Sequence, residues 1–160
     1  VFKGSTDPGI LTKMKDLAGD RVSYRPSTSI GELPSWISHC DAGAAPYRLN
    51  EFTLASNPVK VIEYLAMGIP VLSTRTPSLL RFQEVVEWVE PGDGPSYGQA
   101  LDRILETSKA PSRTRLRQES VAGDSYAVRI EEFKKIVFSV LNGAGEKGLS
   151  PPETRQGITP

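Results

Sequence analysis

Apolar residues along this chain alternate between two spacings, which predict alternating strands and helices. Short unbroken apolar runs are typical of strands that a parallel sheet buries on both faces, and apolar residues three and four positions apart are typical of helices. The short runs occupy residues 1–4, 22–24, 42–46, 69–73 and 85–89. Helical spacing occupies residues 8–17, 31–40, 58–67, 95–106 and 125–141. Strands that alternate with helices predict an α/β fold with a parallel sheet and right-handed crossovers.

The segments between these elements are less regular. We expect a loop over residues 47–56, a helix that carries residues 79–82, and a basic helix or loop over residues 113–122. Residues 142–160 are rich in Gly, Pro and charge and have no apolar periodicity, so we expect a disordered tail there. The predicted folded domain spans residues 1–141.

The segment from Asn57 to Gly68 carries its own start and stop signals. Asn57 is a favourable N-cap, and Pro58 follows at the first helical position, where its missing N–H costs nothing. Gly68 stands where a left-handed residue ends a helix. The apolar residues between them cover most of the helix surface, which is typical of a buried helix; they are Val59, Val61, Ile62, Leu65, Ala66 and Met67.

Two charged residues are out of place in this helix. Lys60 lies in the first turn, where the helix dipole disfavours a cation, and Glu63 lies three residues later among aliphatic side chains. One interpretation is a surface ion pair between them, worth about 0.2–0.5 kcal/mol. The other is a ligand site, because an ammonium at a helix N-terminus binds phosphate and a carboxylate can accept two hydroxyl hydrogen bonds. The residues alone leave both open.

Composition narrows the classes of function. The 160 residues have a net charge of zero, which gives no electrostatic case for nucleic acid as a partner. The one cysteine, Cys40, excludes an internal disulfide and a multi-cysteine zinc site, and we expect no metal site and no cofactor. No apolar run is long enough to span a membrane, so we expect a cytoplasmic protein.

The loops predicted after the strands share one edge of the sheet. In a parallel α/β sheet, ligands bind outside the carboxyl ends of the strands. Residues 25–29, 46–57 and 73–77 all follow strands, and the helix with Lys60 and Glu63 begins at the same edge. We therefore expect the ligand site there.

Two stretches resemble the group 1 glycosyltransferases of the GT-B fold. Residues 56–71, Ser-Asn-Pro-Val-Lys-Val-Ile-Glu-Tyr-Leu-Ala-Met-Gly-Ile-Pro-Val, closely resemble the nucleotide-sugar-binding motif of that family. Residues 31–47, with Glu32-Leu33-Pro34 and Asp41, resemble a second stretch of the family. The likeness runs in order over most of the chain. It implies a Rossmann-like parallel sheet flanked by helices, the carboxy-terminal half of a GT-B fold.

The resemblance also implies a role for particular residues. Glu63 would hold the ribose hydroxyls of a nucleotide-diphosphate sugar, and Lys60 would stabilise its diphosphate as the catalytic residue. The helix start would lie against the same diphosphate, with Ser56, Asn57, Pro58 and Val59. Pro26 and Ser27, in the loop after residues 22–24, would touch the base. Tyr47 could line the donor cleft or pack on its own loop, and we favour the cleft.

The sequence departs from the family at two places. Many group 1 enzymes have a second glutamate eight positions before the equivalent of Glu63, and Ala55 stands there instead. The amino-terminal, acceptor-binding domain is missing, so we interpret the sequence as part of a longer chain and expect residues 1–160 alone to be inactive. The whole protein would be a retaining, metal-independent glycosyltransferase of the hexosyltransferase type, and it could associate peripherally with the cytoplasmic face of a membrane. Two alternatives remain: a nucleotide-sugar epimerase with the same fold, and a non-catalytic α/β interaction module.

Overall fold

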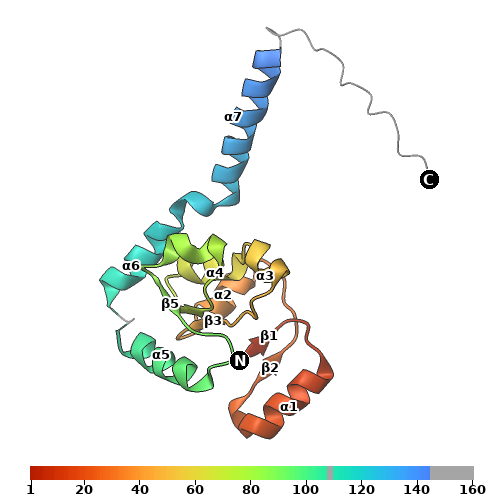
Figure 1. Ribbon diagram of the computed structural model, residues 1–160, viewed down its shortest axis with the longest axis vertical. Helices are drawn as coiled ribbons and strands as arrows, with labels where there is room; N and C mark the ends of the chain where they lie inside the picture. The colour runs from red at the N-terminus through yellow and green to blue at the C-terminus, as the bar shows by residue number, and fades with distance from the viewer. Residues whose placement is uncertain (108–109, 145–160) are drawn as a thin grey trace, which may run out of the picture. The chain divides into compact units, whose positions relative to one another are not determined.

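The computed structural model describes residues 1–107 and 110–144 of the chain. These residues divide into two units, the first from Val1 to Ser120 and the second beginning at Val121. The first unit alternates strands and helices as the apolar pattern predicts (Figure 1). Its strands are β1 (Phe2–Lys3), β2 (Tyr24–Arg25), β3 (Gly43–Ala45), β4 (Val71–Ser73) and β5 (Val86–Trp88). Its helices are α1 (Pro8–Ala18), α2 (Leu33–Ile37), α3 (Glu51–Ala55), α4 (Val59–Ala66), α5 (Gly94–Thr107) and α6 (Pro111–Ser120), with 3-10 turns η1 (Gly19–Arg21) and η2 (Pro77–Phe82).

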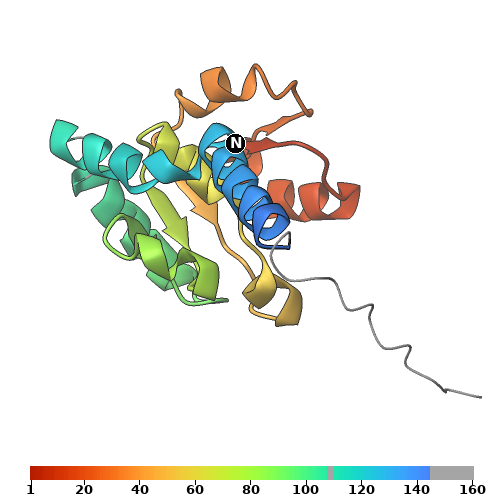
Figure 2. The same cartoon turned by 90° about the horizontal axis from the view of Figure 1, so that it is seen from above.

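All strand pairs of the described residues are parallel, which confirms the predicted α/β class. The larger sheet has the order β3-β4-β5, with Gly43 opposite Val71 and Val71 opposite Val86. Strands β1 and β2 form a separate two-stranded sheet, with Phe2 opposite Tyr24. Figure 2 shows the red and orange elements of that second sheet and α1 beside the yellow and green larger sheet. The predicted single sheet is thus present as two pieces.

Helices α4 and α5 cover opposite faces of the larger sheet. Leu72 packs with Val89, Ala100 and Ile104, so its side of β4 faces α5. Successive side chains of a strand point to opposite faces. Val71 therefore faces α4, whose Val61 and Leu65 are fully buried. Burial on both faces explains why the sequence around β4 is a continuous apolar run.

Helix α4 begins one residue later than the sequence predicts and ends where it predicts. The N-cap is Pro58 and not Asn57, and no side chain caps the helix. At the other end, Gly68 has φ of +73°, in the left-handed region. The amide of Gly68 donates to the carbonyl of Leu65, and the amide of Ile69 donates to the carbonyl of Tyr64, both at 2.9 Å. This pair of bonds is a Schellman motif, and it directs the chain straight into β4.

Several other sequence predictions need correction. The predicted loop over residues 47–56 contains helix α3, which a capping box between Asn50 and Thr53 starts. The helix predicted over residues 31–40 shortens to α2, and the helix around residues 79–82 is the 3-10 turn η2. The apolar side of α1 is not buried, with Leu17 85% exposed. The one cysteine, Cys40, is exposed.

The second unit consists of the 3-10 turn η3 (Ala122–Asp124) and the long helix α7 (Tyr126–Ala144). The hydroxyl of Ser125 accepts a hydrogen bond from the amide of Val128 and caps the start of α7. Two apolar residues of α7, Ile130 and Phe133, are 52% and 66% exposed. From residue 145 onward, the predicted tail lies outside the described residues. Within the described part of the chain, no helix has both the length and the apolar character that crossing a membrane requires.

Candidate functional site

A cavity of about 390 Å³ brings together three of the residues predicted to bind a donor. Ser27, Lys60 and Glu63 all line it. Ser27 follows β2, and Gly4, which also lines the cavity, follows β1. The cavity therefore opens at the carboxyl ends of the two-stranded sheet, beside the first turns of α4. This is the edge at which the loops were expected to converge.

Lys60 lies in the first turn of α4 with its ammonium over an aromatic ring. Its Nζ is 4.7 Å from the centroid of the Tyr47 ring, a cation–π distance. Partial burial lowers the pKa of Lys60 below its ordinary value, because desolvation disfavours the charged form. Much of the residue nevertheless remains exposed. An anion bound beside this ammonium would favour its charged form.

Glu63 lies one helical turn further along α4 and is half-buried. Among the described residues, no hydrogen bond or ion pair is found for its carboxylate, and Lys60 forms no salt bridge with it. The ion-pair interpretation of these two charges is therefore wrong for this structure. Burial raises the pKa of the neighbouring Tyr64 phenol, and the negative charges of Cys40 and Glu63 raise it further. A carboxylate in this setting can accept hydrogen bonds from a ligand.

Hydrogen bonds between loops fix the segments around α4. The amide of Tyr47 donates to the hydroxyl of Thr74 at 3.0 Å, which ties the end of β3 to the end of β4. The hydroxyl of Ser78 donates to the carbonyl of Ser56 at 2.6 Å, which ties the linker before α4 to η2. The start of α4, and with it Lys60, is thus held from two sides.

The predicted site residues differ in whether they line the 390 Å³ cavity. Ser27, Lys60 and Glu63 share the 390 Å³ cavity, and Tyr47 joins them through its ring contact with Lys60. The segment that leads into α4 does not line the cavity; it consists of Ser56, Asn57, Pro58 and Val59. Pro26 precedes Ser27 in its loop and does not line the cavity either.

The cavity also has lining residues to which the sequence assigned no role: Thr28, Trp36 and Tyr64. Tyr64 follows Glu63 directly, but only the folded sheet reveals which way its ring points.

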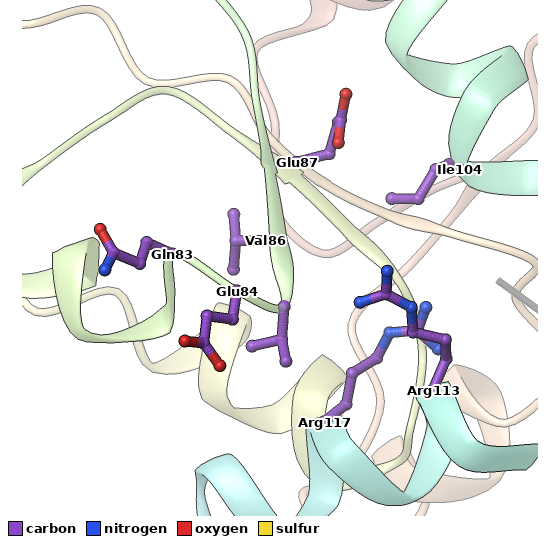
Figure 3. Close-up of a pocket in the computed structure, with 8 residues that line it drawn as sticks. Gln83, Glu84, Val86, Glu87, Ile104, Arg113 and Arg117 are labelled. Atoms are coloured by element: carbon purple, nitrogen blue, oxygen red, sulfur yellow. The ribbon is translucent and has the colours of Figure 1, made fainter. Parts of the chain in front are cut away.

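The basic segment of the sequence is helix α6, most of which is exposed; its one buried residue is Arg117. Arg117 is only 5% exposed, and its Nη1 donates to the carbonyl of Gly68 at 3.1 Å, where α4 ends. Burial lowers the pKa of Arg117, and the charge of Arg113 lowers it further. Both side chains reach a cavity of about 150 Å³ beside β5 (Figure 3). Arg115 pairs with Glu119 at 2.7 Å. The segment is thus a helix in which Arg113 and Arg115 are exposed, whereas Arg117 is buried and holds the end of α4.

A family of known proteins resembles the first two thirds of this chain. The family model described as Glycosyl transferases group 1 matches residues 3–107. The chain belongs to the group 1 glycosyltransferases. That match runs from the end of β1 to α5 and includes every candidate site residue, and the parallel sheet flanked by helices agrees with a Rossmann-like half of a GT-B fold.

One curated protein gives a more specific likeness for this group 1 glycosyltransferase chain. The putative teichuronic acid biosynthesis glycosyltransferase TuaH of Bacillus subtilis (strain 168) is 39% identical over 77 residues. The matched segment covers 46% of this chain and 19% of TuaH. The chain therefore corresponds to a minor part of the length of that relative.

Proposed function

We propose that this chain is the donor-binding part of a glycosyltransferase that uses a nucleotide-diphosphate sugar. The observation that carries the proposal is the cavity in which Ser27, Lys60 and Glu63 meet. It combines an ammonium at a helix start with a carboxylate for which the described residues provide no partner. The first group suits a diphosphate and the second suits the two hydroxyls of a ribose.

Lys60 would act on the leaving group. When the bond between sugar and diphosphate breaks, negative charge accumulates on the diphosphate oxygen. An ammonium and the positive end of a helix dipole stabilise that charge. The proposed course is transfer with retention and without a bound metal, and its support is the resemblance to the family. The aromatic ring of Tyr47 would keep the ammonium in place by the cation–π contact.

The acceptor site lies outside these residues in the proposal. In a GT-B enzyme the acceptor domain is the amino-terminal half, and the relative TuaH is much longer than its matched segment. We propose that the whole protein adds such a domain and works at the cytoplasmic face of a membrane. The 160 residues alone should bind the donor and transfer nothing.

Calorimetric titration of the 160-residue chain with a panel of nucleoside diphosphates tests the proposal. We expect saturable 1:1 binding of at least one nucleotide, and weaker binding of the matching nucleoside, which lacks the diphosphate. If no nucleotide of the panel binds, the chain is a non-catalytic module. Product analysis with a protein that includes the acceptor domain then separates transfer from epimerisation, because an epimerase would convert the sugar without an acceptor.

A further inference from the structure

The cavity of about 150 Å³ lies at the outer edge of β5. Within the described part of the chain, β5 pairs with β4 on one side and with no strand on the other. The cavity lining includes Ile104 of α5 together with Arg113 and Arg117 of α6. Helix α5 covers one face of the sheet, and α6 packs against α4, which covers the other. A cavity that both α5 and α6 line therefore lies at the sheet edge, beside the end of α4, whereas Lys60 lies at the start of α4.

Two arginine side chains of α6 enter this cavity together. Arg113 and Arg117 are one helical turn apart, so they project from the same side of the helix. Figure 3 shows both guanidinium groups pointing from α6 toward β5. Arg117 is buried and Arg113 is exposed, so Arg117 lies deeper in the cavity. The pKa of Arg117 is lowered by burial and further by the charge of Arg113, which places the two charges close together. Two like charges in this arrangement favour an anion between them.

The carboxylates near the cavity do not neutralise Arg113. Glu87 pairs instead with Arg103, whose Nη2 lies 2.7 Å from the carboxylate. Glu84 and Glu87 both line the cavity, but in Figure 3 their carboxylates point away from the two guanidinium groups. Among the described residues, Arg113 forms no ion pair. Its planar fork of N–H donors is thus available to an oxyanion.

The backbone of β5 supplies a further donor. The amide of Val89 donates to the carbonyl of Ser73 at 3.1 Å, so the polar backbone groups of Val89 point toward β4. Those of Val86 point to the outer edge, because neighbouring residues of a strand direct these groups to opposite edges. Val86 is buried and lines the cavity. Its amide therefore faces the same space as the Arg113 guanidinium, and both are donors that oxyanions bind.

We propose that this cavity binds a phosphate group, either inorganic phosphate or a phosphomonoester. A volume of about 150 Å³ holds about five water molecules at roughly 30 Å³ each, and phosphate has five non-hydrogen atoms. Two guanidinium groups match the charge of a phosphomonoester, about −1.5 to −2 at pH 7, better than the single charge of a carboxylate. Arg113 would bind two phosphate oxygens through its fork, and the Val86 amide would donate to a third. This site is separate from the donor cavity, and the proposal does not rest on the donor.

Amide chemical shifts of the 160-residue chain test the proposal, because they report on each site separately. Inorganic phosphate, glycerol 3-phosphate and acetate are titrated in turn in about 0.15 M chloride, which screens weak surface contacts. We expect phosphate to shift the Val86 amide saturably, since about 10 mM ligand fills roughly nine-tenths of a site with a Kd near 1 mM. Lys60→Met removes the ammonium of the donor cavity and should leave this shift unchanged. The absence of a saturable Val86 shift with both phosphate compounds, or its loss in Lys60→Met, would overturn the proposal.

Two matched variants of α6 test the role of Arg113. Arg113→Gln should raise the Kd for phosphate about 10-fold or more, the usual effect of losing a hydrogen bond to a charged group. The variant should fold, because Arg113 is exposed. Arg115→Gln removes the same charge from the same helix, but Arg115 pairs with Glu119 and does not line the cavity, so the Kd should not change. Arg113→Lys keeps the charge without the fork and should give an intermediate Kd. Equal losses in Arg113→Gln and Arg115→Gln would show only general attraction and contradict a site.

The choice of ligands identifies what the cavity binds. Acetate should bind more weakly than phosphate because it has one charge, and equally tight acetate binding would contradict a phosphate site. Saturable binding of either phosphate compound supports the proposal, and the tighter of the two indicates whether the natural ligand is free or esterified. Glu84→Gln addresses a counterion from the chain itself. If the Glu84 carboxylate occupied the cavity in solution, phosphate would bind this variant and not the parent, which would contradict the proposal. No titration uses a nucleotide, so failure here leaves the donor-site proposal to its own test.

Discussion

The backbone of Gly43 in β3 lies directly against the ring of Tyr64 in α4. A Cβ atom added at Gly43 would stand 2.7 Å from ring atoms Cγ and Cε2 of Tyr64, closer than side chains approach one another. Tyr64 lines the 390 Å³ cavity together with Lys60 and Glu63. The absence of a side chain at Gly43 therefore sets how near α4 lies to the sheet, and with it the position of Lys60 and Glu63.

Gly43→Ala should consequently destabilise the domain and weaken ligand binding together. Overpacking of this kind costs about 1–3 kcal/mol in the free energy of unfolding, which denaturant titration measures. Gly98→Ala is the matched control, because its new methyl group meets open space. Adding Tyr64→Ala to Gly43→Ala should recover part of the loss. Full additivity of the two changes would mean that the ring and the glycine do not constrain each other.

Gly68→Ala should cost stability for two separable reasons. The φ of +73° costs a non-glycine residue about 1–2 kcal/mol, and a Cβ atom there would lie 2.5 Å from Cγ2 of Thr114. Thr114→Ser removes that methyl group. The double variant should therefore regain the steric part in thermal unfolding and keep only the backbone part. Gly68→Val, with a β-branched side chain, should be worse than Gly68→Ala. Equal stability of Gly68→Val and the parent would contradict the left-handed helix end.

The elements that could be predicted from the sequence are those with strong apolar patterns. Strand β4 and helix α4 are examples, because buried elements consist of nearly continuous apolar residues and Gly68 marks the turn between the two. Helix α3 could not be found this way. It has only five residues, and its Phe52 is 81% exposed, so its sequence shows no helical spacing of apolar residues. It depends on local hydrogen bonds between Asn50 and Thr53, each at 2.9 Å.

The candidate site likewise has features that could be predicted from the sequence and contacts that could not. Lys60 and Glu63 could be singled out because a cation at a helix start and a carboxylate among aliphatics are both locally unfavourable. The contact between Lys60 and Tyr47 depends on the path of a loop, and the inward position of Arg117 depends on where α6 crosses the end of α4. No spacing in the sequence encodes those contacts, since residues 49 positions apart form the second.

The lowered pKa of Lys60 predicts a pH dependence. In the empty protein, burial favours the neutral amine, so the unfolded chain binds more protons than the folded one between the lowered pKa and about 10.5. Stability should rise with pH across that window, and Lys60→Met should lack this rise. A bound diphosphate favours the ammonium, so affinity should fall as pH rises through the lowered pKa. Lys60→Arg should move that fall to higher pH. Titrations from pH 8 upward measure both effects, and a Kd that is independent of pH would argue against a Lys60–diphosphate contact.

Glu63→Gln is the sharpest test of the donor site. Glutamine keeps the shape of glutamate but has one acceptor oxygen, so its amide must face the second ribose hydroxyl. Hydrogen bonds to a charged acceptor are worth about 1.5–3 kcal/mol each. The hydroxyl oxygen can still accept a hydrogen bond from the glutamine amide, so we expect a total loss of about 1.5–3 kcal/mol in binding free energy. This loss corresponds to a Kd raised about 10- to 150-fold. Glu51→Gln, a change in α3 at a residue that does not line the cavity, should leave the Kd unchanged.

The chemical origin of this loss can be checked from the ligand side. A 2′,3′-dideoxy nucleoside diphosphate offers no ribose hydroxyls, so the parent and Glu63→Gln should bind it about equally. Lys60→Met should have the reverse effect. It should weaken the binding of nucleoside diphosphates and leave the binding of nucleosides unchanged. Folding should survive Glu63→Gln, because the described structure gives the carboxylate no partner to lose. If Glu63→Gln binds nucleoside diphosphates as tightly as the parent does, the ribose is held elsewhere and the assignment of Glu63 is wrong.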